Sequence, residues 1–353
     1  MASFANRYVA VQREGATYGT GAGAVLYGFV DDENLKQSYD IIERNDMSYW
    51  SAHNSAVGKQ YTEGDLNFVL QADDFCGMLV YCAMGGDNAV SSGTHNFVEK
   101  VSNDLPSFSV TVGRDDRNHS FTGMMVSRMS ISATAGEYVT ASFSLIGKSE
   151  GATTALATPD WGVGDNKSGA NAVDGMHFKD SSVRFMADAQ DSIYVRSFTI
   201  ELNNNLDTDN ACALGSDTFT RKPIMQRREV SGTLEFTRPL YDTTGGTATP
   251  SMESEPTYNE LTAAGGLEDA NTTYAVKLIL SDGTNATNIL LYNVRYEAPQ
   301  AGVSGRDAET MSVGFKAYMN LAAGMANVET MQIDWKTANT GTGSGNTALY
   351  SVI

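Results

Sequence analysis

Hydrophobic and polar residues alternate along most of this chain, and the alternation comes in two series separated by polar stretches. A period of two is typical of a strand with one buried and one solvated face. The pattern therefore predicts a mainly β protein with two sets of strands. We expect strands at 34–44, 64–71, 108–112, 121–134 and 138–148 in the first series, and at 197–206, 231–238, 273–280, 287–298 and 309–319 in the second.

Two short runs are typical of helices instead. Asp73 and Asp74 precede the apolar run Phe75–Met84, and Gly85-Gly86 follows it, which predicts a capped helix that ends at the glycines. The run TYNELTAAGG at 257–266 occupies the matching place in the second series and also ends in Gly-Gly.

The order of elements repeats. Each series reads strand, long irregular stretch, strand, helix, three strands, and each has one arginine in its longest late strand, Arg128 and then Arg295. The alternative to duplication is two unrelated β domains that share generic hairpin patterns. Similar spacing favours duplication: Gly64 and Gly232 are 168 positions apart, and Gly113 and Gly283 are 170 apart.

These patterns predict five regions. They are an N-terminal arm (1–33), a first domain (34–148), a linker or insertion (149–196), a second domain (197–320) and a C-terminal segment (321–353). Long irregular stretches are expected at 45–63 and 207–228, one in each domain. An insertion at 243–256 has no counterpart in the first domain.

Charge narrows the function. The chain has 353 residues, with 24 basic and 42 acidic side chains, and a net charge of −18. Proteins that bind nucleic acids usually neutralise phosphates with Lys and Arg, so this balance argues against such a surface. It suits a surface that must not adhere to a polyanion, although solubility alone would also account for it.

The number of cysteines and the hydropathy of the chain indicate the compartment in which the protein assembles. Three cysteines, Cys76, Cys82 and Cys212, are too few and too odd for a disulfide framework, which fits assembly in a reducing cytoplasm. The first fifteen residues lack the pattern of a signal peptide, and no apolar run reaches the ~18 residues of a transmembrane helix. We therefore expect no membrane association.

No motif for catalysis, metal or cofactor binding emerges. None of the four histidines has a second histidine or cysteine at ligand spacing, so no zinc site is expected. Ile146-Gly147-Lys148-Ser149 has Ser142 where a phosphate-binding loop requires glycine. No G-x-S-x-G is present, and Gly15–Gly23 lacks the strand and helix of a dinucleotide site. We expect no enzyme, no metal and no cofactor.

Three stretches carry a family resemblance. They are SFTIELNNNL at 197–206, RREVSGTLEFTRPL at 227–240 and SFTGMMVSRMSISATAGEYVTASFSLIGK at 120–148. With the order of elements around them, they resemble the tail tube (major tail) proteins of long-tailed, siphovirus-type bacteriophages. The resemblance covers most of 34–148 and 197–320 and lies in the pattern, without an invariant motif.

The resemblance implies two tandem tail-tube domains, each a β-sandwich or half-barrel flanked by a short helix. Six such domains would close a ring, so three two-domain chains would form a pseudo-hexamer, and rings would stack into a tube. The implied partners are further copies of the chain, a tape-measure protein in the lumen, a tail terminator and distal tail or baseplate proteins. DNA would pass through without specific binding, and the protein would belong to the virion tail after assembly in the host cytoplasm.

Two sets of residues become candidates for these roles. A ring of three chains would carry a charge of −54, and acidic side chains near inner strands would repel phosphates over about 8 Å, one Debye length. The expected ring-stacking residues are Tyr49, Trp50, Tyr61, Phe219, Ile224 and Met225. The expected lumen-facing acidic residues are Asp65, Glu137, Glu201, Glu235 and Glu297.

Two other functions remain open from the sequence. Tandem sandwiches with exposed Tyr and Trp also suit a carbohydrate-binding or receptor-binding module of a phage or cell surface. A hydrolase with dispersed carboxylates is the third possibility, although the sequence singles out no catalytic pair.

Overall fold

The main element of the fold is one large antiparallel sheet. The structure is a computed structural model that describes residues 7–45, 47–48, 50–52, 54–91, 94–99, 104–114, 116–156, 159, 174–185, 195–236, 267–268, 275–297, 300–302, 310–319 and 330–336. The large sheet has sixteen strands, of which nine form the central order β18-β21-β23-β17-β14-β9-β10-β5-β3 and seven pair beside it. They are β1 (Tyr8–Glu14), β2 (Gly21–Gly28), β3 (Asp32–Glu33), β4 (Lys36–Arg44), β5 (Asn54–Val69), β8 (Phe108–Arg114), β9 (Arg117–Thr134), β10 (Thr140–Gly147), β11 (Ser149–Glu150), β12 (Thr154–Ala155), β14 (Val195–Asn203), β17 (Glu229–Phe236), β18 (Leu267–Glu268), β21 (Asn293–Tyr296), β22 (Gln300–Gly302) and β23 (Thr310–Tyr318).

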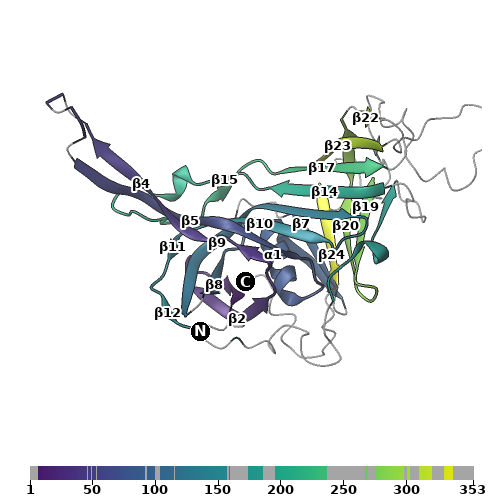
Figure 1. Ribbon diagram of the computed structural model, residues 1–353, viewed down its shortest axis with the longest axis horizontal. Coiled ribbons are helices and arrows are strands. Elements are labelled where there is room, and N and C mark those ends of the chain that lie inside the picture. The colour runs from purple at the N-terminus through teal and green to yellow at the C-terminus, as the bar shows by residue number, and fades with distance from the viewer. Residues whose placement is uncertain are drawn as a thin grey trace, which may run out of the picture.

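A second, six-stranded sheet has the order β13-β19-β20-β24-β7-β6. Its strands come from both ends of the chain, because β24 near the C-terminus pairs with β7 of the first half. In Figure 1, β19, β20 and β24 of this sheet run steeply across β14 and β17 of the large sheet. The strands are β6 (Gly85–Ser91), β7 (Thr94–Glu99), β13 (Ser182–Phe185), β19 (Val276–Ser281), β20 (Ala286–Leu291) and β24 (Met331–Lys336). A small ladder joins β15 (Leu206–Asp207) to β16 (Ile224–Met225), and short 3₁₀ turns lie at Phe178–Asp180 and Asp209–Ala211.

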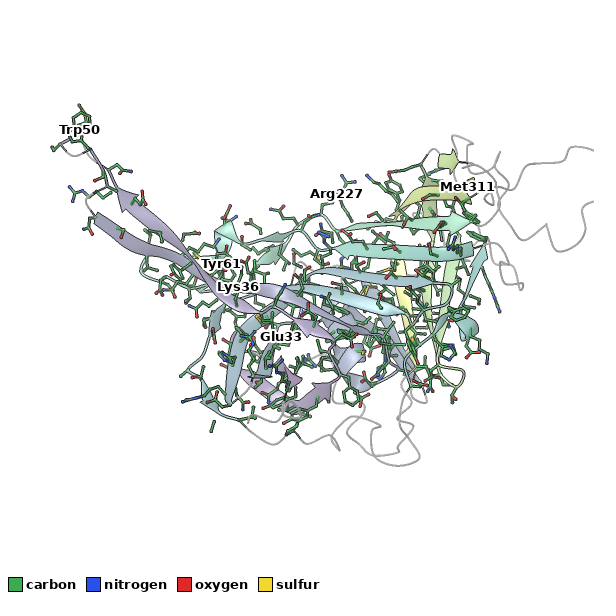
Figure 2. The ribbon with its side chains drawn as sticks, in the orientation of Figure 1. Glu33, Lys36, Trp50, Tyr61, Arg227 and Met311 are labelled. Carbon is green, nitrogen blue, oxygen red and sulfur yellow. The ribbon has the colours of Figure 1, made fainter. Side chains whose placement is uncertain are left out.

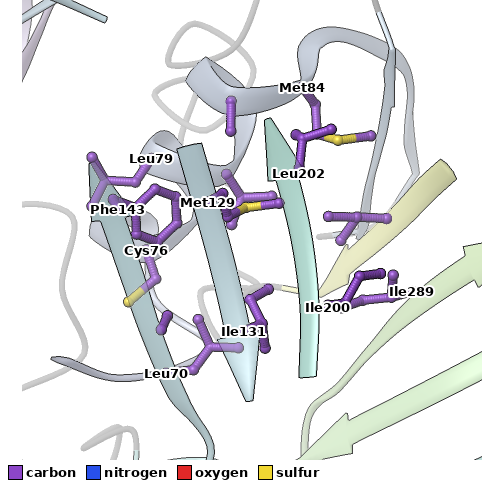
Figure 3. Packing of buried hydrophobic residues seen from close by; sticks show 14 of the residues in the cluster. Leu70, Cys76, Leu79, Met84, Met129, Ile131, Phe143, Ile200, Leu202 and Ile289 are labelled. Carbon is purple, nitrogen blue, oxygen red and sulfur yellow. The ribbon is translucent and has the colours of Figure 1, made fainter. Parts of the chain in front are cut away.

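The core lies around the one α-helix of the described residues, α1 (Asp74–Met84). All eleven of its residues are buried, and it packs against β9, β1 and β2 of the large sheet and against β6 and β7 of the second. Figure 3 shows Leu79 and Met84 of α1 over Met129 of β9 and Leu202 of β14. A helix that is apolar on all sides is explained by burial on all sides.

Both ends of α1 have the caps that the sequence predicts. The Asp73 carboxylate accepts a hydrogen bond from the Cys76 N–H at 2.8 Å. Gly85 takes the left-handed conformation, with φ of 91°, and its N–H donates to the Tyr81 carbonyl. Glycine suits this position because a side chain would strain a left-handed backbone.

The second half of the chain also holds the C-terminus of α1. Arg228 donates from its guanidinium to the carbonyls of Ala83 and Met84, at 3.3 and 3.2 Å, and Asn204 donates to the Ala83 carbonyl at 3.1 Å. A cation at a helix C-terminus complements the helix dipole. Burial lowers the pKa of Arg228, and the nearby Glu99 carboxylate acts in the opposite direction.

Most expected strands are confirmed, including those at 34–44, 64–71, 108–112, 121–134, 138–148, 197–206, 231–238 and 309–319. The range 287–298 contains two strands, β20 and β21, which are separated at Tyr292. The expected second helix at 257–266 and the insertion at 243–256 lie outside the described residues.

Several stretches expected to be irregular are strands. The N-terminal arm was the wrong interpretation for residues 7–33, because β1 and β2 belong to the large sheet and Val9, Val11 and Leu26 are buried in the core. The stretch 45–63 is largely strand, since β5 begins at Asn54. The residues between α1 and the strand expected at 108–112 contain β6 and β7, the linker region contains β11, β12 and β13, and the C-terminal segment contains β24. Several of these strands pair with strands far away in the sequence: β1 with β8, β13 with β19, and β24 with β7.

We predict that Asp73→Ala lowers the free energy of unfolding by about 1–2 kcal/mol, because α1 loses a side-chain N-cap in a buried setting. Asp73→Asn keeps a capping oxygen and is the matched control, with a smaller loss. Urea denaturation followed by circular dichroism measures both. Equal losses for the two variants would contradict the capping role.

Candidate assembly surfaces

One surface is the hairpin of β4 and β5, which projects from the body (Figure 1). Trp50 lies at its tip, and Tyr61, Lys36 and Glu33 lie toward its root (Figure 2). The pair Ile41 and Val57 directly face each other across the two strands, yet their side chains are 62% and 59% exposed. An isolated two-stranded hairpin is marginal in water, and an exposed apolar patch indicates a binding surface.

Of the expected stacking residues in this hairpin, two have a described position. Trp50 and the neighbouring Met47 are fully exposed. Tyr61 is partly buried, and Tyr49 lies outside the described residues. The apolar character of the tip therefore rests on Trp50 and Met47, together with Tyr39, Ile41, Ile42 and Val57 along the strands.

The second irregular stretch, 204–228, lies against the body and the hairpin root. Met225 is buried with Leu105 and Met125, whereas Ile224 is 42% exposed. Phe219 is fully buried and stacks on Tyr61, with ring centres 6.3 Å apart and planes 6° from parallel. Sequence reasoning named Phe219 and Met225 as anchors for another ring, but both side chains pack within their own chain.

Lys59 completes this contact. Its ammonium group lies 5.4 Å from the Phe219 ring centre and 5.7 Å from that of Tyr61, and it donates to the Thr208 carbonyl at 3.1 Å. An aromatic pair contributes about 0.5–1.5 kcal/mol and a partly exposed cation–π contact about 0.5–1 kcal/mol. The sequence contained no signal for this cluster, because the three side chains converge only in the folded chain.

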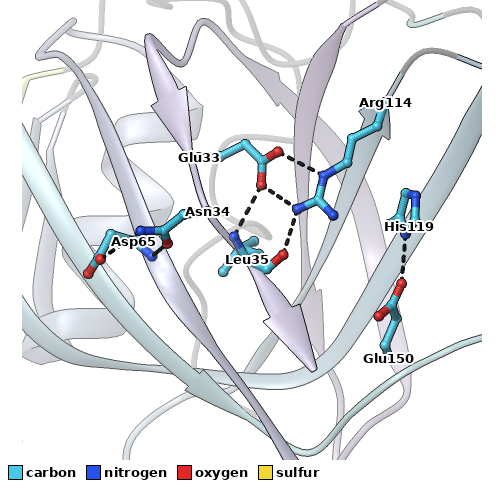
Figure 4. Close-up of polar contacts among 7 residues, drawn as sticks. All are labelled: Glu33, Asn34, Leu35, Asp65, Arg114, His119 and Glu150. Carbon is cyan, nitrogen blue, oxygen red and sulfur yellow. Dashed lines mark hydrogen bonds and ion pairs between the residues drawn. The ribbon is translucent and has the colours of Figure 1, made fainter. Parts of the chain in front are cut away.

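Polar contacts fix the segment that leads into β4 (Figure 4). Arg114 donates to both carboxylate oxygens of Glu33, at 2.8 and 2.6 Å, and to the Leu35 carbonyl at 2.6 Å. The hydrogen bonds to Glu33 raise the pKa of Arg114 against the effect of burial. On β5, Asp65 accepts from the Asn34 amide at 3.2 Å and from the Ser144 hydroxyl at 2.6 Å.

The second surface is the face of the large sheet that points away from α1. Side chains alternate along each strand, so Leu66 and Phe68 are buried whereas Asp65 and Asn67 point to the other face. We call this the open face. Short hydroxyl side chains dominate it: Ser130, Ser132, Thr134, Thr140, Ser142, Ser144, Ser197, Thr199, Ser231, Thr233, Thr310 and Ser312.

The strand registers place residues from both halves in continuous rows across the open face. One row joins seven adjacent strands without interruption. From β5 to β21 it consists of Asn67, Ser142, Ser130, Glu201, Ser231, Lys316 and Arg295.

Four of the five acidic candidates lie on this face: Asp65, Glu201, Glu235 and Glu297, the last beside Gly314 of β23. Glu235 accepts from the Ser197 hydroxyl at 2.9 Å, and Glu201 lies 3.4 Å from Arg128. Glu137 lies in the turn between β9 and β10, and Glu297 follows β21, where its N–H donates to the Gly314 carbonyl at 2.7 Å. The structure thus brings together part of the predicted set.

The open face has both signs of charge. Its acidic residues are Asp32, Glu63, Asp65, Glu201, Glu229, Glu235 and Glu297, and its basic residues are Lys36, Arg128, Arg295 and Lys316. The Lys36 ammonium group lies 3.6 Å from the Glu63 carboxylate. The large negative charge of the chain is therefore not concentrated on this face, which is hydroxyl-rich and has only a small excess of acidic residues.

Sites of other kinds are not found in the described part of the chain. Among those residues, no group of three or more His, Cys, Asp or Glu is placed to hold a metal ion. Within the same residues, no helix is long and apolar enough to cross a membrane.

These features define a β-rich assembly protein with an exposed apolar hairpin and a broad polar sheet face. The comparison with family models gives the particular family: residues 6–317 match the model described as phage tail tube protein, and the chain belongs to this family. It is a structural, non-enzymatic component of the virion tail. No curated protein matches the chain.

We predict that the carboxylates of the open face contribute little to stability. Glu201→Gln and Glu235→Gln should each change the free energy of unfolding by less than about 1 kcal/mol, because their contacts are partly exposed. Glu14→Gln is the contrasting variant. The buried Glu14 accepts from the N–H groups of Gly19 and Gly123 and from the hydroxyls of Ser107 and Ser109.

The Glu14 variant should lose more than about 2 kcal/mol, since charge-assisted bonds in a buried site are lost. Guanidinium denaturation of the three variants measures the difference. A comparable loss in Glu201→Gln would mean that the open-face carboxylates hold the fold together.

Proposed function

We propose that this protein forms the tail tube of a long-tailed phage from rings of three chains, each with two tandem tube domains. The main support for this proposal is the order in which the strands pair. In the first half β4, β5, β10 and β9 are neighbours in that order, and in the second half β14, β17, β23 and β21 are. These strands occupy the same places in the two sequence series, which supports duplication.

Matching positions support the same equivalence. Gly64 and Gly232 both lie where an added side chain would collide with the neighbouring strand: the backbone of Leu35 beside Gly64, and the Thr199 carbonyl beside Gly232. Opposite these glycines are the buried Leu145 and Phe315. The register of backbone pairing also recurs, as Asn67–Ser142–Ser130 in one half and Glu235–Ser312–Gln300 in the other.

The junction between the halves suggests how chains join. The last strand of the first group, β9, pairs antiparallel with the first strand of the second group, β14. The same geometry would pair the β21–β22 edge of one chain with β3–β4 of the next. Three chains with eight such strands each would then close a barrel of 24 strands without exposed edges.

The open face would line the lumen. Serine and threonine are short and neutral, and the acidic residues outnumber the basic ones, so the wall offers a phosphate backbone little to bind. Asp65, Glu201 and Glu235 would face the passing DNA, and the lumen would hold a tape-measure protein before ejection. Tail terminator and distal tail proteins would bind the two ends of the tube.

The hairpin would connect rings along the axis. Trp50, Met47 and Ile224 are exposed apolar side chains at or near this end of the sheet. Head-to-tail contacts that do not close on themselves generate filaments. The hairpin would bury its apolar residues against the next ring.

We predict that the purified protein at high concentration forms hollow filaments in negative-stain electron microscopy. Averaged end-on views should show six lobes that alternate with threefold symmetry, because each chain supplies two similar but unequal domains. Six identical subunits in a ring would contradict the tandem arrangement, and a persistent monomer would contradict the tube.

A disulfide pair tests the contact between chains. By the equivalence above, Lys36 corresponds to Glu201, and Gln300 corresponds to Ser130, which directly faces Glu201 at the β9–β14 junction. Lys36→Cys with Gln300→Cys, in a Cys212→Ser background, should therefore form disulfides between chains in assembled rings. Facing residues of antiparallel strands have Cβ atoms about 4.5–5.5 Å apart, within reach of a disulfide after small adjustment.

The control is Ser130→Cys with Glu201→Cys, which should close within one chain. Non-reducing gel electrophoresis should show a ladder up to trimer for the first pair and only monomer for the control. Assembled tubes that give an intrachain control bridge but no ladder would rule out this register.

A further inference from the structure

The connections that join the first and second strands of the two halves are equivalent in chain order but differ in position. In the first half, residues 45–53 join β4 to β5 at the tip of the projecting hairpin. In the second half, residues 204–228 join β14 to β17 and lie against the body, where Met225 and Phe219 are buried. We propose that the second connection is a clamp that holds the hairpin in one direction for assembly.

In the described part of the chain, the hydrogen bonds, the ion pair and the ring contacts between the clamp and the hairpin fall on three consecutive residues of β5, Lys59, Gln60 and Tyr61. The Gln60 N–H donates to the Asp217 carbonyl at 2.6 Å, and the Gln60 amide donates to the Asp217 carboxylate at 2.7 Å. Lys59 donates to the Thr208 carbonyl and lies 3.4 Å from the Asp209 carboxylate. Tyr61 stacks on Phe219, and the Lys59 ammonium group lies over both rings.

The clamp is itself anchored to the body. Asn204 donates to the Ala83 and Val126 carbonyls, and Lys222 lies 3.2 Å from Asp104. The Thr220 N–H donates to the Ala211 carbonyl at 2.9 Å, which closes the loop around Phe219. Force on the hairpin is thus transmitted through Lys59, Gln60 and Tyr61 to the helix and to β9.

Distance makes this root contact important. Trp50 lies beyond the start of β5 at Asn54, and the five residues from Lys59 to Asn54 alone span about 17 Å at about 3.3 Å per residue. From Asn54 to Val57 all residues of β5 are exposed, so the chain itself offers the outer hairpin little support. A small rotation at the root would move the tip by many ångströms, and fixing the root reduces the entropy that binding must offset.

This inference rests on the proposed stacking role of the hairpin and adds to it. Each chain would present one projecting hairpin instead of two, because the second connection holds the first. A ring of three chains would therefore present three such hairpins. Lys59, Asp217 and Phe219 would act as positioning residues without contacting the next ring.

Spin labels can measure the direction of the hairpin in the unassembled chain. Ser51→Cys near the tip and Glu137→Cys in the β9–β10 turn, in a Cys212→Ser background, give one distance distribution by pulsed electron paramagnetic resonance. We expect a narrow distribution in this parent protein. Lys59→Met and Phe219→Leu should each broaden it clearly, whereas Lys59→Arg, which keeps the cation, and Lys179→Met, which removes an exposed lysine elsewhere, should leave it narrow.

Assembly is measured with the same variants without labels. Lys59→Met and Phe219→Leu should raise the critical concentration for filament formation by about tenfold through lost preorganisation. Trp50→Ala should raise it as well but leave the distance distribution narrow, since it removes a contact at the tip only. Circular dichroism checks that each variant is folded.

The outcomes separate the two proposals. A narrow distribution in both Lys59→Met and Phe219→Leu overturns the clamp, whatever happens to assembly. A broad distribution with unchanged assembly overturns the positioning role. If Trp50→Ala assembles normally, the stacking role of the hairpin fails, and the distance measurement still decides whether 204–228 clamps it.

Discussion

The antiparallel pairing of β9 with β14 is the interaction on which the rest of the structure depends. It aligns seven residues of one half with seven of the other, from Ser197 opposite Thr134 to Asn203 opposite Arg128. Two groups of strands thereby become one continuous sheet with one apolar and one polar face. Without this pairing each half would present an unpaired strand edge, a known route to unwanted association.

The same junction explains where the helix lies. Because β9 and β14 are neighbours, their apolar residues Met129 and Leu202 form a joint platform for α1 (Figure 3). Residues of the second half then reach the end of the helix: Arg228 and Asn204 bond the carbonyls that the last turn leaves free. The helix of the first half thus depends on both halves for its burial and for its C-terminal partners.

Under the proposed duplication, the two halves are free to diverge, and the two strand connections differ most. The connection from β4 to β5 forms the tip of an exposed apolar hairpin, whereas the connection from β14 to β17 packs Phe219 against Tyr61 at the root of that hairpin. The open face has remained more alike in the two halves, with serine at matching positions such as Ser142 and Ser312. Such a division is consistent with one surface that must be uniform around a ring and another that only one copy needs to supply.

The sequence by itself determined the local elements. The alternation of apolar and polar residues predicted most long strands, and the capping residues Asp73 and Gly85 predicted the ends of α1. Both signals depend only on neighbours in the chain. The sequence also placed Asp65, Glu201 and Glu235 on strands. The pairing register of these strands then puts the three carboxylates on the same face of the large sheet. Short strands such as β1, β13 and β24 escaped prediction because they pair with strands far away in the sequence: β1 with β8, β13 with β19, and β24 with β7.

Only the tertiary structure decided what the apolar residues of the irregular stretches do. Trp50 and Phe219 look alike in the sequence, as aromatic residues in long polar segments, yet one is fully exposed and the other fully buried. The difference arises from where each segment goes after leaving the sheet, and that depends on contacts such as Lys59 with Phe219, between residues 160 positions apart. The distribution of charge on the open face could not be predicted for the same reason. Composition gives the number of charged residues, and only the fold determines which face of the sheet each one lies on.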